Sequence, residues 1–339
     1  MPSGNPTDAF KAHSNYIRAF AQLVAPRIHL PRAMLQAVAT AVKALPPGKT
    51  TAPNVDGALN SLSIAWRTES LLDWTAHALP EDAFAKLANT WAVIQVYYVF
   101  YHATQALAQA KGFVRPHSHP KTRDMFYDYW AGRSLALAPW SFAVGHDGPR
   151  NVAPGVAIND AIHVWERCDH TSCWSLAAKA LRTTREEAIS DAIKRKRFGL
   201  QRDRMREWEQ KEAKRVQDGR KARIRPTFPR PILSAGVKSA VEQGVRPFTV
   251  MDYLYRLRLR TNYRDAAIFT DGPEEQGESL AVLNDLRRLC SATLLLHEIT
   301  LARLLGGDVL RQHASSFLTS TAPPSSVFVY LRERIGFIT

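Results

Sequence analysis

One uncharged stretch, residues 89–112, limits what this chain can fold into. Its sequence is NTWAVIQVYYVFYHATQALAQAKG, and no charged side chain occurs from Thr90 to Ala110. Asn89 or Thr90 can cap the start of a helix, and Gly112 can end it in the left-handed conformation. Such a helix of about 22 residues rises about 33 Å, which is long enough to span a membrane.

The polar residues of this stretch argue against a membrane span. Gln95, His102, Gln105 and Gln109 would lie in hydrocarbon, and the tyrosines occur in the middle of the run rather than at its ends. Gln95, His102 and Gln109 are seven residues apart, so they share one face of the helix. We therefore predict an all-α fold, a helical bundle around this central apolar helix, which carries one polar line.

The rest of the chain divides into four predicted parts. They are N-terminal helices (1–80), the first half of the helical bundle (81–180), a long basic helical arm with a Pro-rich connector (181–235), and the second half of the bundle with a C-terminal tail (236–339). The three cysteines have no disulfide-framework spacing, and the N-terminus lacks the apolar run of a signal peptide. Both features favour a cytoplasmic protein.

Helix starts are predicted from residues that cap a helix or favour its first turn. These residues are Glu81 and Asp82 after Pro80, Thr184 with Glu187, Thr249 with Asp252, and Asn284. The helix that starts at Thr184 is expected to run to about Gly219, and the last one to Gly306. We also expect short helices at 157–168 and 175–181, and a strand in the run VFVYL at 327–331.

The chain carries a formal net charge of +14, and most of it lies in the arm. Residues 181–230 contain 17 Lys and Arg against 8 Asp and Glu, a surplus of nine positive charges. Clustered cations bind phosphate groups in a salt-dependent way, so we predict contact with nucleic acid. The expected RNA-binding residues of the arm are Lys194, Arg195, Lys196, Arg197, Arg202, Arg206, Lys214, Arg215, Arg220, Lys221 and Arg223.

Other partners fit the same charge. A helix that is polar on nearly all sides also suits a solvated arm or a docking surface for a partner protein. Acids interleaved at 203, 207, 209 and 212 weaken the positive field. An anionic membrane surface is a third candidate partner. Phe198 and Trp208 either stack on bases or pack the arm onto the body.

A second basic segment follows the central helix. Its potentially cationic side chains are Arg115, His117, His119, Lys121 and Arg123, and two prolines stiffen it. We predict that this segment contacts RNA phosphates. The alternative is a basic loop that lies in solvent.

Two segments carry a resemblance to a known superfamily. YYVFYHATQALAQAKG (97–112) resembles the YYaxfHAxxALLxxxG helix of the HEPN superfamily, and RLRTNYRD (258–265) resembles its Arg-rich R-x-x-x-x-Y-x-D helix. The resemblance covers residues 85–130 and 250–305. It implies a helical bundle. Many members are metal-independent ribonucleases of defence or toxin–antitoxin systems, and often they are dimers with the active site at the subunit interface. It therefore implies an RNA partner, a homodimer and no cofactor.

The chain departs from the active members of that superfamily at one motif. They carry R-x(4–6)-H, in which Arg stabilises phosphate charge and His assists proton transfer. No His of this chain follows an Arg at that spacing. The catalytic candidates are therefore His102 of the central helix with Arg260, Asn262 and Arg264 of the second segment. We expect His102, the basic loop and the face of Arg256, Arg260 and Arg264 to meet. The alternative is a bundle without nuclease activity, in which His102 is hydrogen-bonded in the core.

Metal and cofactor motifs are weak in this sequence. His163, Cys168, His170 and Cys173 are zinc-ligand types within 11 residues, but their spacing matches no familiar zinc finger. We predict no metal there. The sequence contains no G-x4-G-K-[ST], G-x-G-x-x-G, H-E-x-x-H or G-x-S-x-G motif, which removes the common nucleotide-binding, metalloprotease and hydrolase signatures.

Overall fold

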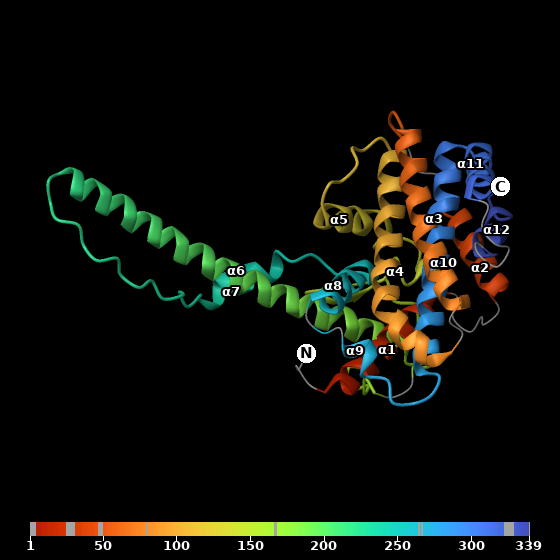
Figure 1. The fold of residues 1–339 in the computed structure, drawn as a ribbon, viewed down its shortest axis with the longest axis horizontal. Coiled ribbons are helices and arrows are strands. Elements are labelled where there is room, and N and C mark those ends of the chain that lie inside the picture. Colours follow the sequence, from red (N-terminus) through yellow and green to blue (C-terminus); the bar gives the residue numbers. More distant parts are fainter. Residues whose placement is uncertain are drawn as a thin grey trace.

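The computed structural model describes residues 5–24, 31–46, 50–78, 81–165, 168–263, 265, 267–321 and 329–338. The fold is all-α, a helical bundle from which one long helix projects as an arm (Figure 1). The helices are α1 (Pro6–Leu23), α2 (Pro31–Lys43), α3 (Val55–Ala78), α4 (Asp82–Ala110), α5 (His119–Trp130), α6 (Cys173–Gln217), α7 (Ala235–Gln243), α8 (Val250–Tyr263), α9 (Ala267–Thr270), α10 (Glu278–Leu305), α11 (Gly307–Thr321) and α12 (Val329–Ile335). A 3-10 turn η1 (Leu135–Leu137) and an antiparallel pair, β1 (Ala143–Gly145) and β2 (Gly148–Arg150), lie between α5 and α6.

The predicted central helix is α4, and its buried position is confirmed. α3 and α10 pack along it, and one core joins it to side chains of α1, α2, α5, α6, α8, α9, α11 and α12. The predicted cap at Asn89 or Thr90 was wrong, whereas the helix start predicted at Glu81 and Asp82 is confirmed, because α4 begins at Asp82 behind Glu81. Asn89 is fully buried inside α4 and donates to the Ser279 carbonyl of α10 at 2.9 Å, so it fastens two helices together instead of capping one.

Gly112 ends this helix as predicted. Its φ of +88° is left-handed, and a Cβ at this position would lie 1.6 Å from the carbonyl oxygen of Thr51. Both the backbone angle and the close approach therefore require glycine. Within the described ranges, no helix combines the length and the apolar character needed to cross a membrane.

The arm is one continuous helix, and the predicted start at Thr184 was wrong. α6 runs over 45 residues, about 68 Å, and includes the segment 175–181 that we expected as a separate helix. Its first four turns pack on α1 and bury Leu176, Ala177 and Leu181. Thr184 is buried, and its hydroxyl donates to the Ala180 carbonyl at 2.6 Å. Packing against α1 thus keeps the chain helical at Thr184, although the local sequence there is typical of a helix start.

The predicted helix at 157–168 is wrong, because the described residues of this segment are irregular and side chains of α6 hold them. The Asn159 amide donates to Ser175 Oγ at 2.8 Å, and Lys179 Nζ donates to the Ile162 carbonyl at 2.8 Å. These bonds satisfy an irregular backbone that a helix would otherwise satisfy internally.

Two further boundaries were wrong and one was right. Asn284 lies inside α10, which begins at Glu278. The predicted strand at 327–331 is contradicted where it is described, because α12 begins at Val329; positions 327 and 328 lie outside the described residues. The start of α8 is confirmed, since Asp252 Oδ2 accepts the Thr249 amide at 2.9 Å. The four-part division of the chain stays a prediction.

Candidate nucleic-acid interface

The arm consists of α6 and an extended segment, residues 219–234, that returns beside it (Figure 1). Trp208 contacts Phe228 edge to face at 6.4 Å, and the Arg230 guanidinium lies 4.2 Å from the Phe198 ring. Phe198 and Trp208 of α6 therefore pack against the return segment. This arrangement leaves the opposite face of α6 to solvent.

Some of the arm's cations are neutralised within the arm. Glu212 is the main acceptor: Arg215 donates to it at 3.0 Å, Arg223 Nε at 2.9 Å and the Arg223 amide at 2.6 Å. Arg225 pairs with Glu209 at 2.8 Å. Arg215 and Arg223, both expected to bind RNA, thus hold the return segment on the helix.

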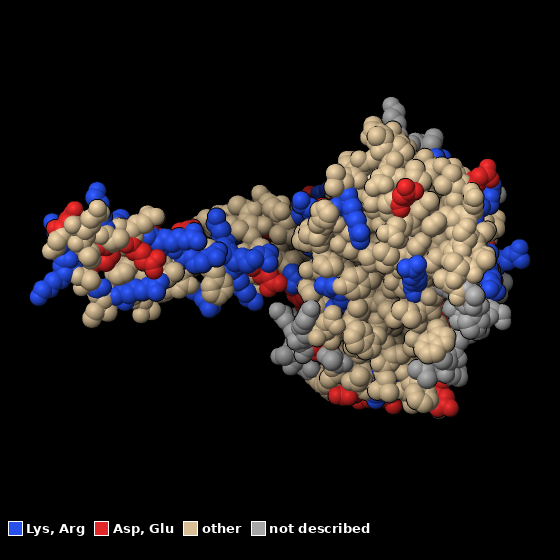
Figure 2. All heavy atoms as spheres, turned by 45° about the horizontal axis from the view of Figure 1, so that its top comes forward, with Lys and Arg blue, Asp and Glu red and all other residues tan. Residues whose placement is uncertain are grey.

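A row of exposed arginines without a carboxylate partner among the described residues runs along α6. Arg195, Arg202 and Arg206 are seven and four residues apart, which places them on one side of the helix. All three are exposed, and none has a carboxylate within ion-pair distance in the described part of the chain. Figure 2 shows Lys and Arg side chains along much of the arm. We call these three residues the arm row.

The other expected cations of the arm differ in their surroundings. Lys194 lies 3.9 Å from Asp191, and Arg197 is half-buried with an Nε that has no partner among the described residues. The remaining ones are exposed: Lys196, Lys214, Arg220 and Lys221.

A cleft of about 720 Å³ opens at the base of the arm, between the start of α5, α6, residues 244–248 and α8. Arg195 of the arm row lines it, together with Arg256 and Arg260. Arg256 pairs with Asp191 at 2.8 Å, and Arg260 pairs with Glu187 at 2.5 Å. These two arginines therefore join α8 to α6.

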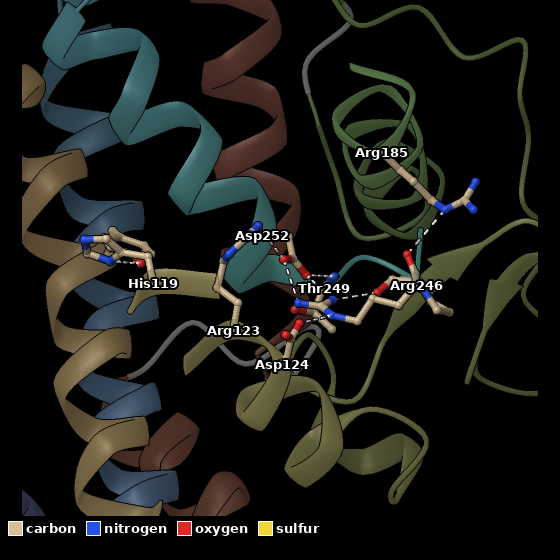
Figure 3. A network of polar contacts seen from close by, with 9 residues as sticks. His119, Arg123, Asp124, Arg185, Arg246, Thr249 and Asp252 are labelled. Carbon is tan, nitrogen blue, oxygen red and sulfur yellow. Dashed lines mark hydrogen bonds and ion pairs between the residues drawn. The ribbon is translucent and has the colours of Figure 1, made fainter. Parts of the chain in front are cut away.

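Asp252 organises the far wall of this cleft (Figure 3). Its carboxylate is fully buried and accepts from Arg123 at 3.1 Å and from Arg246 at 2.8 Å. Arg246 also pairs with Asp124 at 2.8 Å. Buried Arg185 fixes this loop by donating to the carbonyls of residues 242, 245 and 246. The wall is a matched set of charges and holds the loop to α5 and α8.

A cluster of histidine and tyrosine side chains lies on α4, on the other side of Arg123. The loop after α4 runs back along the helix, because Gln105 Nε2 donates to the Pro116 carbonyl at 2.8 Å. Arg115 Nε donates to Gln105 Oε1 at 3.2 Å. The return brings His119 Nδ1 within 2.7 Å of the Tyr97 hydroxyl.

Aromatic contacts complete this cluster. The His119 ring lies 4.8 Å from that of Tyr101, and the His102 ring lies 5.2 Å from Tyr101 and stacks on Tyr98 at 6.0 Å. Arg123 connects the cluster to the cleft, since its guanidinium lies 4.2 Å from the Tyr255 ring.

Burial sets the protonation of these groups. Burial, with Arg115 nearby, lowers the pKa of His102 to about 4. Burial and the charges of Arg258 and Arg123 lower the pKa of His119, so both imidazoles are neutral at pH 7. Burial also raises the pKa of Tyr97 above its ordinary range, so its hydroxyl keeps the proton. Where the Tyr97 hydroxyl donates in its hydrogen bond with His119 Nδ1, the hydrogen of the neutral imidazole is on Nε2.

Arg258 lies at the centre of the cluster and differs from its neighbours. It is 7% exposed, and its guanidinium lies 5.0 Å from the Tyr97 ring, 5.5 Å from Tyr98 and 5.3 Å from Tyr255. Nη1 donates to the Tyr98 hydroxyl at 2.9 Å. Its Nε has no hydrogen-bond partner, and no carboxylate pairs with it within the described residues. Our sequence reasoning missed this residue; its three-residue spacing from Tyr255 was the available signal.

The structure thus brings only some of the predicted site residues together. His102, His119, Arg115 and Arg123 gather around the tyrosines, while Arg260 turns to α6. The other predicted residues of this region are His117, Lys121 and Asn262, which are exposed, and Arg264, which lies outside the described residues. Gln109, predicted to share the polar line with His102, donates to Ser61 of α3 at 2.8 Å.

The four zinc-ligand types do not form a cluster in the structure. The His163 ring stacks on Trp165 at 6.5 Å, and burial raises the pKa of Cys168 to about 12 and that of Cys173 to about 11. The part of the chain that the structure describes contains no group of three His, Cys, Asp or Glu placed to hold a metal ion.

No protein-family model, curated protein or solved structure matches this chain.

Proposed function

We propose that this protein is a HEPN-like RNA-binding protein and that the arm is its main phosphate-binding surface. The arm row carries the proposal, because its three exposed arginines have no carboxylate partner in the described part of the chain. Such a row contacts a phosphate backbone without reading the base sequence. The HEPN-like residues of α4 and α8 indicate the same partner, since many members of that superfamily act on RNA.

Binding of a 5′-labelled single-stranded RNA of about 20 nucleotides tests this proposal by fluorescence anisotropy over a salt series. We expect Arg202→Gln/Arg206→Gln to lower the slope of log K against log salt by about 1.4, because each phosphate contact contributes about 0.7 on a single strand. Arg32→Gln/Arg332→Gln removes the same charge from exposed positions of the body and should leave the slope unchanged. Equal slopes for the two double variants would refute the arm as the interface.

Metal-independent cleavage of RNA is a second candidate, favoured by neutral His119 close to Arg123 and Arg258. In that reaction a histidine takes the 2′-hydroxyl proton, the 2′ oxygen bonds to phosphorus, and the 5′ oxygen leaves and takes a proton from solvent. Incubation of labelled RNA with EDTA decides: products that form with the wild type and not with His119→Ala indicate cleavage.

A protein partner on the arm is the alternative to RNA, because acids interleave with its cations. Protein purified without nucleic acid, shown by its A260/A280 ratio, together with no RNA binding at low salt, would favour it. Light scattering during size-exclusion chromatography tests the homodimer that the HEPN resemblance implies.

A further inference from the structure

We infer that Tyr98, Tyr101, His119 and Arg258 form a binding site for one unpaired nucleotide, with the base on the tyrosine rings and the phosphate on Arg258 and His119. The site lies on α4 and α8, apart from the arm row. The inference rests on the proposed RNA binding for the source of the nucleotide, and a free nucleotide shares the same chemistry.

The state of Arg258 is the first argument for an anionic ligand. Four other arginines nearby all have carboxylate partners: Arg123, Arg246, Arg256 and Arg260. Arg258 is more than nine-tenths buried, yet among the described residues its guanidinium has tyrosine rings and one phenol oxygen as partners and no carboxylate. Aromatic faces stabilise a cation but do not neutralise it, and a buried charge without a counter-ion lowers stability. A bound phosphate would supply the missing negative charge.

Hydrogen-bond donors around Arg258 fit a phosphate group. In the tautomer whose Nδ1 accepts from the Tyr97 hydroxyl, His119 presents Nε2–H as a donor. Three nitrogen atoms of this region have no partner among the described residues, namely His102 Nδ1, Arg123 Nε and Arg258 Nε. Buried polar atoms of a native protein are nearly always satisfied, so their concentration here indicates a ligand site. Figure 3 shows His119 beside α4, with Arg123 between it and Asp252.

The tyrosines give the site its preference for an unpaired base. Tyr98 and His119 are half-buried, so part of each side chain remains open to solvent, and Tyr101 lies directly against His119. Aromatic side chains of this kind hold bases by stacking, which requires a free base face. Bases inside an A-form duplex stack on each other and expose no such face. The site should therefore select single-stranded RNA over duplex RNA.

The cleft connects this site to the arm. Arg123 touches the Tyr255 ring of the cluster and also lines the cleft, and Arg195 of the arm row lines the same cleft. A strand held by phosphates on the arm row therefore has a cationic path to Arg258. The arm supplies affinity in this arrangement, and the tyrosine site supplies discrimination between single and double strands.

Anisotropy with a single-stranded RNA of about 20 nucleotides and with its duplex at one salt concentration tests the inference. Wild type should bind the single strand at least about 10-fold more tightly. Tyr98→Leu should weaken single-strand binding by roughly 5- to 150-fold and leave duplex binding unchanged, which is the range for loss of one stacked base. Tyr98→Phe keeps the ring and should stay within about 3-fold of wild type. Tyr98 is half-buried, so these variants should fold, and circular dichroism checks this.

The outcomes distinguish a failure of the nucleotide site from a failure of RNA binding by the arm. Equal wild-type affinity for single strand and duplex, or single-strand binding unchanged in Tyr98→Leu, overturns the nucleotide site even if salt-dependent RNA binding persists. RNA binding lost in Arg202→Gln/Arg206→Gln but not in Tyr98→Leu supports the arm alone and likewise overturns the site. Calorimetry with 5′-AMP shows whether the bound nucleotide belongs to RNA or is free. If AMP binds, Tyr98→Leu abolishes this binding and RNA does not bind, the site takes a free nucleotide. If neither ligand binds, both proposals are overturned.

Discussion

Arg334 of α12 lies fully buried between α3 and α10, and its replacement should destabilise the bundle. Nη1 and Nη2 donate to the two carboxylate oxygens of Glu69 at 2.6 Å each. Nε donates to Glu298 at 2.9 Å, and Nη1 also reaches Ser291 Oγ at 2.9 Å. Trp66 Nε1 donates to Glu298 at 2.7 Å. One arginine from the last helix thus links two carboxylates of the core.

Arg334→Met should lower the free energy of unfolding by about 3–5 kcal/mol, because it leaves two buried carboxylates without their cation. The loss should depend on pH. Burial raises the pKa of Glu69 from its ordinary value of 4.5 to about 7, although the charge of Arg334 lowers it. An acid whose pKa is higher in the folded state loses stability as the pH rises from about 4.5 through about 7. Without Arg334 this pKa rises further, so the variant should be closest to wild type near pH 5 and furthest from it near pH 8.

Urea unfolding followed by tryptophan fluorescence measures this loss at both pH values. Arg332→Met changes an exposed arginine of the same helix and should cost less than about 0.5 kcal/mol. The triple variant Glu69→Gln/Glu298→Gln/Arg334→Met removes the charges together and should recover much of the loss. A cost below about 1 kcal/mol for Arg334→Met, or one that is equal at pH 5 and pH 8, would contradict the reasoning.

Three further variants test individual parts of the fold. Gly112→Ala should destabilise the fold by more than about 2 kcal/mol in thermal melts. Gly219 also has a positive φ, but no atom lies within 4 Å of an added Cβ, so Gly219→Ala should cost only about 1 kcal/mol. Similar costs for the two variants would show that the contact with Thr51 does not matter. Asp252→Asn should lower the free energy of unfolding in urea by about 2–4 kcal/mol, because it weakens two ion pairs and a helix cap. Asp124 is half-exposed, so Asp124→Asn should cost less than about 1 kcal/mol. The reverse order would be inconsistent with the role of Asp252. Glu212→Gln should release the return segment and speed trypsin cleavage at 220–225 relative to wild type, and an unchanged rate would show that Glu212 does not hold it.

Local sequence signals determined several features of this protein correctly. The charge-free run predicted the central helix, because burying its apolar side chains on all sides requires neighbouring helices. Gly112 and the Thr249–Asp252 pair act within a few residues of their own backbone, so their roles follow from the sequence. The cation surplus likewise located the arm. Each of these signals depends on neighbours along the chain.

Tertiary partners decided the features that local signals missed. Thr184 and Asn284 have the residue types of helix caps, but packing against α1 and α4 continues each helix past them. The resemblance to HEPN proteins marked His102 and Arg260, and the structure separates them, since Arg260 pairs with Glu187.

The arginines of α8 show the physical reason most clearly. Arg256, Arg258 and Arg260 alternate along the sequence, and residues two apart point about 200° apart around a helix. The sequence by itself predicted that α8 is a helix with Arg256 and Arg260 on one face. Only the packing of α4 on one side and α6 on the other decided that Arg256 and Arg260 meet carboxylates while Arg258 meets three tyrosine rings.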